Sequence, residues 1–152
     1  MNARKLRRGL ALPLSEQGLA IEALAFLGIS RAVLAVLPFR IAMRGLGLRL
    51  AEGGGLDDAD RNGPAPSPIV LLIGDAVRRA ASVAPFKAVC LQQAVAASLM
   101  LRRRGYRTQI HFGVTKDEGG ALIAHAWSRC HGKLVTGAQQ MPHYQPISVF
   151  VT

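Results

Sequence analysis

An apolar helical stretch with a cysteine at its start, followed directly by strand-like segments, is the feature that most constrains the fold. Residues 91–101 carry no charge and read as a buried helix, which begins at Cys90 and ends before Gly105. The segments that follow alternate in the manner of strands: 107–115, 121–130 and 133–137, with a shorter one at 147–151. Helices followed by an antiparallel meander indicate an α+β fold.

The rest of the chain divides by composition. Residues 1–51 predict an N-terminal helical region behind a basic arm. Residues 52–68 combine three glycines in a row, three aspartates and several prolines, which is typical of a linker. Residues 69–152 are expected to form the core domain, which opens with a helix at about 69–83.

Within the N-terminal region we expect two helices, at about 16–27 and 31–44. Ser15 is the expected N-cap of the first helix, because its hydroxyl oxygen can accept a bond from a backbone N–H of the first turn. Gly28 is expected to separate the two helices, and Pro38 to kink or split the second. Three interpretations of these apolar helices stay open: ordinary core, partner-binding surface or membrane-surface helix. Core and partner surface are favoured.

The net charge of +10 suggests an anionic partner, but it does not by itself select one. The basic residues are not interleaved with aromatic residues, so we do not expect nucleic acid binding. The uncharged runs between Glu22, Arg31 and Arg40 are eight residues long, which is too short for a bilayer. We find no signal peptide pattern and expect a cytoplasmic protein.

The two cysteines, Cys90 and Cys130, do not make a disulfide framework. Cys130 and His131 are adjacent, and the chain has no C-x-x-C pair, so we expect no metal site. The chain also lacks a P-loop motif, and no cofactor is predicted.

Cys90 and His125 are the candidates for covalent chemistry. A thiolate is a much better nucleophile than a thiol, and a helix N-terminus and a nearby imidazole both favour it. Cys90 at a helix start and His125 on a later strand have the layout of a papain-like or transglutaminase-like cysteine enzyme. The plain alternatives are a buried structural cysteine and a histidine satisfied in the core.

Several short motifs between about residues 84 and 137 are specific in combination. They are Cys90-Leu91-Gln92-Gln93-Ala94, His111-Phe112-Gly113-Val114, Ala124-His125-Ala126-Trp127, Gly132 and Gly137. Together they resemble the lasso-peptide leader peptidases, or B proteins, which are transglutaminase-like cysteine proteases of ribosomal-peptide biosynthesis. The resemblance implies a papain- or transglutaminase-like fold, in which N-terminal helices precede a nucleophile-bearing helix packed on a small antiparallel sheet.

The resemblance also implies an activity and partners. The activity is removal of the leader peptide from a lasso precursor, after which a separate lasso cyclase closes the ring. Residues 1–66 show no strands of the leader-recognition domain that fused members carry, so the chain resembles the split form. The implied partners are the precursor leader peptide, a separate leader-recognition protein and the cyclase.

Roles follow from the same resemblance. Cys90 carries over as the nucleophile and His125 as the base and then the acid. Trp127 shares a strand face with His125 and is expected to shield the pair from water. The oxyanion hole is expected from backbone N–H groups at the helix start, at Cys90 and Leu91. The side chain of Gln92 or Gln93 is a candidate second donor.

The third catalytic group is where the chain departs from the family, which usually offers an aspartate on the strand after the histidine. No Asp, Glu or Asn follows Glu118. Gln139 is the best amide candidate to orient His125, with Thr136 and a backbone carbonyl behind it. Asp75 would qualify only if its helix packs beside the site.

Two rival functions therefore remain. One is acyl transfer to an amine on the same Cys–His pair. The other is a non-catalytic scaffold that delivers the precursor to the cyclase. The basic run 102–104 is either a solvated helix end or a docking site for an acidic leader.

Overall fold

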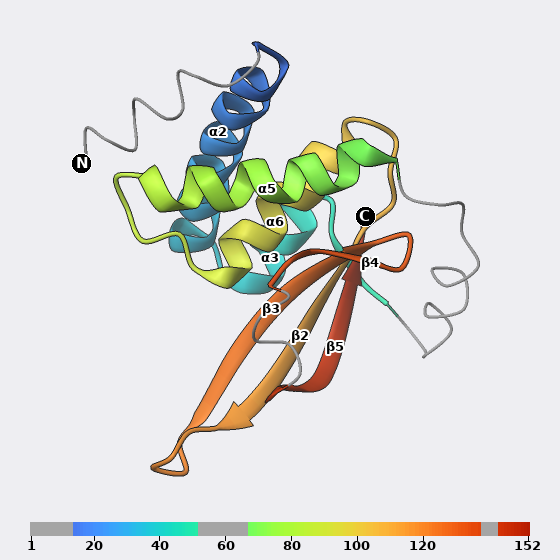
Figure 1. Ribbon diagram of the computed structural model, residues 1–152. Coiled ribbons are helices and arrows are strands. Elements are labelled where there is room, and N and C mark those ends of the chain that lie inside the picture. Colours follow the sequence, from blue (N-terminus) through green and yellow to red (C-terminus); the bar gives the residue numbers. More distant parts are fainter. Residues whose placement is uncertain (1–13, 52–66, 138–142) are drawn as a thin grey trace.

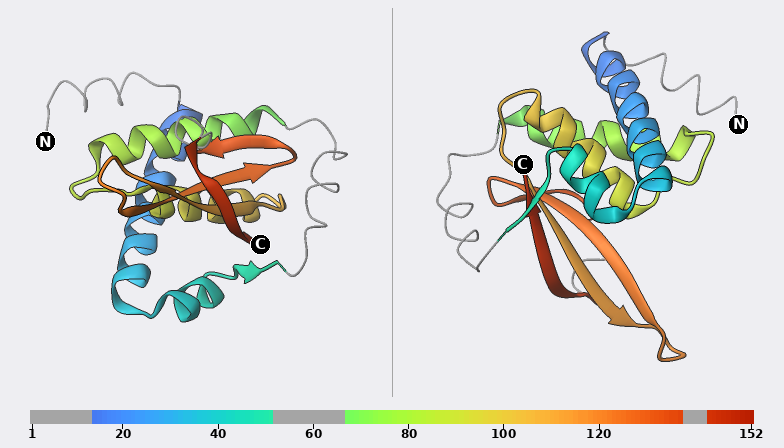
Figure 2. Two further views of the ribbon diagram at one scale, coloured as in Figure 1. Left: turned by 90° about the horizontal axis from the view of Figure 1, so that it is seen from below. Right: turned by 180° about the vertical axis from the view of Figure 1, so that it is seen from behind.

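The computed structural model describes residues 14–51, 67–137 and 143–152, which form a layer of helices packed on one antiparallel sheet (Figure 1). The elements in chain order are α2 (Leu14–Val36), α3 (Phe39–Gly45), β1 (Arg49–Leu50), α5 (Pro68–Val83), α6 (Cys90–Arg102), β2 (Gln109–Lys116), β3 (Leu122–Cys130), β4 (Lys133–Thr136) and β5 (Gln145–Val151). The helices gather on one side, and β2, β3 and β5 extend away from them (Figure 2). The predicted α+β fold is confirmed.

The sheet has the order β1-β5-β2-β3-β4, and every neighbouring pair is antiparallel. A long hairpin joins β2 to β3, and its turn is closed by Asp117, whose carboxylate accepts bonds from the N–H groups of Gly119 and Ala121 at 2.9 and 2.8 Å. Between β3 and β4, His131 and Gly132 both have positive φ, 47° and 71°, as a tight two-residue hairpin requires. The predicted turns and strands are therefore present.

The expected helices at about 16–27 and 31–44 are wrong in their bounds, because α2 covers the first, the gap and the start of the second. It is one continuous helix from Leu14 to Val36, so Ser15 lies within it rather than capping it, and Gly28 does not interrupt it. A glycine weakens a helix only by about 1 kcal/mol, which packing against neighbouring helices can offset. The break comes instead at Pro38, which lacks the N–H that a continuing helix needs and which precedes the short α3. The split at Pro38 is confirmed.

β1 is a strand that the sequence did not predict. It pairs Arg49 with Val151 and Leu50 with Phe150, so the N-terminal region supplies the edge of the sheet. Two residues are too short to leave an alternating pattern. The predicted domain boundaries stay a prediction, and most of the linker lies outside the described residues.

Two apolar clusters form the core, and α6 contributes to both. One joins α6 to α2, α5 and the β3–β4 turn region; from α6 it takes Ala96, Ala97, Met100 and Leu101. The other joins α6 to α3 and the sheet; its buried members are Met43, Leu46, Leu48, Ala94, Val95, Leu99, Ile110 and Ala126. α6 is therefore the central helix of the fold, and the alanines on it allow close packing on both sides.

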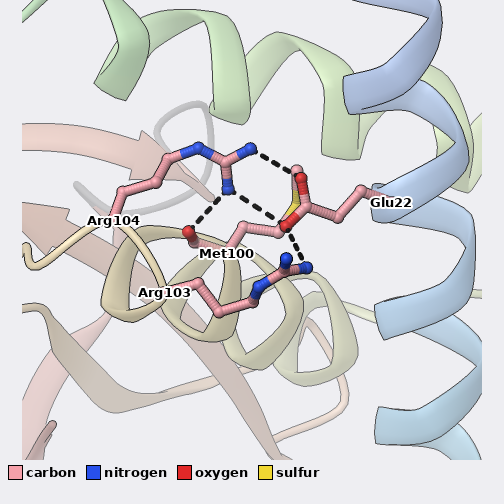
Figure 3. Close-up of polar contacts among 4 residues, drawn as sticks. All are labelled: Glu22, Met100, Arg103 and Arg104. Atoms are coloured by element: carbon pink, nitrogen blue, oxygen red, sulfur yellow. Dashed lines mark hydrogen bonds and ion pairs between the residues drawn. The ribbon is translucent and has the colours of Figure 1, made fainter.

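A charged clasp ties the C-terminal end of α6 to α2 (Figure 3). Glu22 accepts hydrogen bonds from Arg104 at 2.7 and 3.0 Å and from Arg103 at 2.9 Å. Arg104 also donates to the carbonyl of Met100 at 2.9 Å. The hydrogen bond with Glu22 raises the pKa of Arg104 above its ordinary value, and burial acts in the opposite direction. The basic run at 102–104 thus has internal partners, since Arg102 also donates to the carbonyl of Leu46 at 2.7 Å.

Candidate active site

Cys90 is the first residue of α6, as predicted, and it carries a half-buried free thiol. The first intrahelical bond runs from the N–H of Gln93 to the carbonyl of Val89, at 3.1 Å. The N–H groups of Cys90 and Leu91 precede this bond, so the helix itself does not use them. A nucleophile with unused backbone donors beside it is the arrangement that an oxyanion hole requires.

The two glutamines after Leu91 hold the loop that leads into Cys90. The side-chain oxygen of Gln92 accepts a bond from the N–H of Val89 at 3.1 Å, and this glutamine is buried. The amide nitrogen of Gln93 donates to the carbonyl of Ala88 at 2.9 Å. Both contacts fix the backbone just before the cysteine, which is a function that the sequence did not suggest. Their part in an oxyanion hole stays a prediction.

His125 lies in the fourth position of β3 and is buried. Its Nε2 lies 3.2 Å from the carbonyl oxygen of Gly137, just after β4. A carbonyl only accepts, so this bond assigns the proton to Nε2 in the neutral ring. Nδ1 then keeps its lone pair and is the atom that can take a proton from a nucleophile.

Gly137 is the residue that makes this contact possible. Its φ is 78°, in the left-handed region that glycine adopts without cost. A Cβ atom there would lie 2.7 Å from Cβ of Trp127, 2.9 Å from the carbonyl oxygen of Ala126 and 3.0 Å from Nε2 of His125. The backbone of residue 137 therefore reaches the imidazole because it has no side chain.

A stack of rings encloses His125. Trp127 is buried on the same face of β3, with ring centroids 6.2 Å apart, as the two-residue spacing predicts. His111, opposite Trp127 on β2, stacks on it at 5.6 Å and lies 3.0 Å from the side-chain oxygen of Gln109. Tyr144 lies 5.0 Å from the His125 ring. The sequence did not predict these ring contacts of His111 and Tyr144, because they depend on strand register and on the return of the chain to β5.

Cys90 and His125 come from adjacent layers. Cys90 packs against the apolar cluster that contains Ala126, the residue after His125. Neighbouring residues of a strand point to opposite faces of the sheet, so the His125 side chain lies on the face opposite to this cluster. No hydrogen bond joins Cys90 to His125 in the described part of the chain. The structure therefore does not bring Cys90 and His125 into contact, and the approach of Sγ to Nδ1 belongs to the functional proposal.

The other candidates for the third group are placed as follows. Gln139 lies outside the described residues. The Thr136 hydroxyl is 2.8 Å from that of Ser128, within the β3–β4 pair. Asp75 forms an ion pair with Arg78 on the surface of α5. Among the described residues, the backbone carbonyl of Gly137 is the alternative that contacts His125.

The described residues contain no group of three or more His, Cys, Asp or Glu side chains that could hold a metal ion.

Residues Ser15–Val36 of α2 are long and apolar enough to span a bilayer, unlike the expectation from the uncharged runs. Length and composition do not distinguish a membrane span from a core helix of a soluble protein, which can be equally long and apolar.

The comparison with protein families gives one match. Residues 33–149, more than half of the chain, match the family model described as Transglutaminase-like superfamily. Proteins of this superfamily commonly include cysteine peptidases and acyltransferases. Curated proteins and solved structures gave no match to the chain.

Proposed function

Because the chain belongs to the transglutaminase-like superfamily, we propose that it is a cytoplasmic cysteine endopeptidase that removes the leader from a ribosomally made precursor peptide. The resemblance of residues 84–137 to the lasso-peptide leader peptidases supports a lasso precursor as the substrate. The same resemblance supports a separate leader-recognition protein and a lasso cyclase as partners. No cofactor is needed for this reaction.

The observation that carries the proposal is Cys90 at the first residue of α6, inside the matched domain. Sγ of Cys90 attacks the carbonyl carbon of the scissile peptide bond, while its proton passes to Nδ1 of His125. The carbonyl oxygen becomes an oxyanion, for which the N–H groups of Cys90 and Leu91 are the proposed donors. Collapse of this intermediate breaks the C–N bond and leaves a thioester on Cys90.

His125 then returns the proton to the leaving amine, which is the new N-terminus of the core peptide. Water attacks the thioester, His125 takes a proton from that water, and the leader leaves with a free carboxylate. Cys90 recovers its proton and the cycle closes. Trp127 and the stacked rings beside His125 exclude water from the imidazole during the first step.

We assign the orientation of His125 to the carbonyl of Gly137. An acceptor on Nε2 fixes the tautomer and restrains the ring, which leaves Nδ1 to take the proton. This is the positioning function that a carboxylate or amide side chain serves in related enzymes. Gly137 follows β4, the strand next to β3, where the resemblance puts an aspartate. Gln139 remains the alternative side-chain partner.

The test is cleavage of the precursor peptide by the purified protein, with and without the leader-recognition protein. Cleavage that depends on both Cys90 and His125 supports the peptidase, provided that the masses of the leader and the core peptide add up to the mass of the precursor plus one water. Transfer of the leader to an added amine would instead assign acyl transfer. If the precursor binds but stays intact under all conditions, the scaffold function replaces the peptidase.

A further inference from the structure

The outer face of α2 is a continuous apolar stripe that the other described residues leave uncovered. We call it the α2 stripe; its members are Gly18, Ile21, Ala25, Ile29, Ala32 and Val36. Their spacing of three and four residues puts them on one side of the helix. All six are exposed, with Ile21 at 69% and Val36 at 79%. The stripe is about 27 Å long, from the rise of 1.5 Å per residue.

The opposite side of α2 is fixed in the core. Leu19, Ala23 and Leu27 are buried in the cluster that joins α2 to α5 and α6. Figure 2 shows α2 on the outside of the helical layer when the molecule is seen from behind. α2 therefore cannot cross a bilayer without giving up that core, and its outer face is the part available to a partner.

The charged residues of α2 are not members of the stripe, and each contacts a neighbouring element. Glu16 pairs with Arg79 of α5 at 3.2 Å, and Glu22 is held by the clasp from α6. Arg31 donates to the carbonyl of Lys87 at 3.4 Å, and its guanidinium lies over a phenylalanine ring of the same loop. Both acidic groups of α2 are thus neutralised internally, and the stripe itself carries no charge.

Positive charge lies beyond both ends of the stripe. Before it, residues 1–13 carry four basic residues and no acidic one. After it, Arg40, Arg44 and Arg49 are exposed beside the exposed apolar side chains of Phe39 and Ile41. An uncharged apolar stripe between two basic ends complements a membrane whose headgroups are anionic.

We propose that the α2 stripe attaches this protein to the surface of an anionic membrane, with α2 lying along the interface. The basic ends disfavour the other simple occupant, a second copy of α2. Pairing two copies in parallel or antiparallel would bring basic ends together in either case, and like charges repel. A fluid bilayer also needs no groove, and the stripe is the convex side of a helix.

This attachment leaves the strand that carries His125 uncovered. β2, β3 and β5 extend from the side of the molecule that faces away from α2, as Figures 1 and 2 show. His125 lies on β3, so a membrane bound to the α2 stripe does not cover that strand. The proposal does not depend on the peptidase function and can fail separately from it.

The experiment is flotation of the full chain with phosphatidylcholine vesicles, with and without phosphatidylglycerol, at low and high salt. We expect binding only with phosphatidylglycerol and weakening by salt. Ile21→Glu with Val36→Glu should weaken that binding by about tenfold or more. Leu122→Glu is the matched control, because Leu122 is 70% exposed on the far β2–β3 hairpin. This variant should bind the vesicles as the unchanged protein does.

Circular dichroism checks that each variant is folded, and the pair Ile21→Gln with Val36→Gln repeats the test without adding charge. Binding that survives both double variants overturns the proposal, as does equal binding to uncharged vesicles. A protein that does not float but forms a dimer, dissociated by Ile21→Glu in light scattering, assigns the stripe to a second copy and also overturns it. A monomer that does not float leaves the stripe without the proposed role and rejects it.

Discussion

The start of α6 and the corner between β3 and β4 hold their reactive groups in contrasting ways. Cys90 is half-buried, and side-chain amides of its own helix fix the loop before it. His125 is buried, and it is held by the backbone that follows β4 and by a stack of rings. The first region is local in sequence, whereas the second is assembled from β2, β3 and the segments that follow β4 and precede β5. The proposed nucleophile and its proposed base are therefore supported in different ways, one by local contacts and the other by contacts between distant segments.

The largest effect should come from the nucleophile itself. Cys90→Ala removes the sulfur that forms the thioester in the proposed mechanism, and we expect precursor cleavage to fall by at least about 10³-fold. Cys130→Ala is the matched control, since Cys130 is buried in the other apolar cluster. It should keep cleavage within a few-fold. Equal loss in both variants would show that folding rather than chemistry had been measured.

Gly137→Ala should have the next largest effect, because it breaks the support of His125 without touching the ring. The added Cβ collides with Trp127 and His125, so we expect a loss of cleavage on the order of 10²-fold. ¹⁵N NMR of the imidazole should show that the proton is no longer confined to Nε2.

Gly105→Ala is the control for backbone strain alone. Gly105 has a φ of 80°, close to that of Gly137, but a Cβ there would meet nothing within 4 Å. Both variants should lose about 1 kcal/mol of unfolding free energy from the left-handed conformation. Only Gly137→Ala should change the imidazole signals. If both variants change cleavage alike, the carbonyl of Gly137 is not the positioning group.

Gln92→Leu tests the support on the Cys90 side and should act more weakly. It removes the acceptor for the N–H of Val89 and should cost about 1 kcal/mol of unfolding free energy, measured by urea denaturation. Cleavage should fall only several-fold, because the helix start is still present. A loss as large as that of Gly137→Ala would instead give Gln92 a direct part in the oxyanion hole.

The smallest effect is expected from Gln139→Ala. If the carbonyl of Gly137 positions His125, this change should alter cleavage by less than about threefold, with an unchanged pH profile. Steady-state kinetics of leader removal measures it. A loss near 10²-fold would move the positioning function to the Gln139 amide and sharpen the contrast between the two regions.

The sequence was most informative about the local region. The uncharged helix from Cys90, the turn at His131 and Gly132, and the split at Pro38 all follow from short-range patterns, and the structure contains them. Short-range patterns did not predict the single helix through Gly28 or the two-residue strand β1. A glycine is tolerated when tertiary packing supports the helix, and a strand of two residues has no period to detect.

The surroundings of His125 were harder to predict. The placement of Trp127 follows from strand alternation, because that relation needs only two residues. The contacts of His111 and Tyr144 depend on the register of β2 with β3 and on the path into β5. Every residue has a backbone carbonyl, so the sequence does not show which carbonyl contacts Nε2 of His125. This partner could therefore be predicted only as one of several alternatives.

A main-chain acceptor at Nε2 also has a consequence for inheritance. When a carboxylate side chain orients a histidine, a single codon change deletes it. No codon change can delete the carbonyl of residue 137, since every amino acid carries one. What a mutation can remove is the absence of a side chain. Any other residue at position 137 keeps the carbonyl oxygen, but its Cβ would collide with Trp127 and His125. In this protein, selection on a catalytic hydrogen bond would be recorded as selection for a glycine.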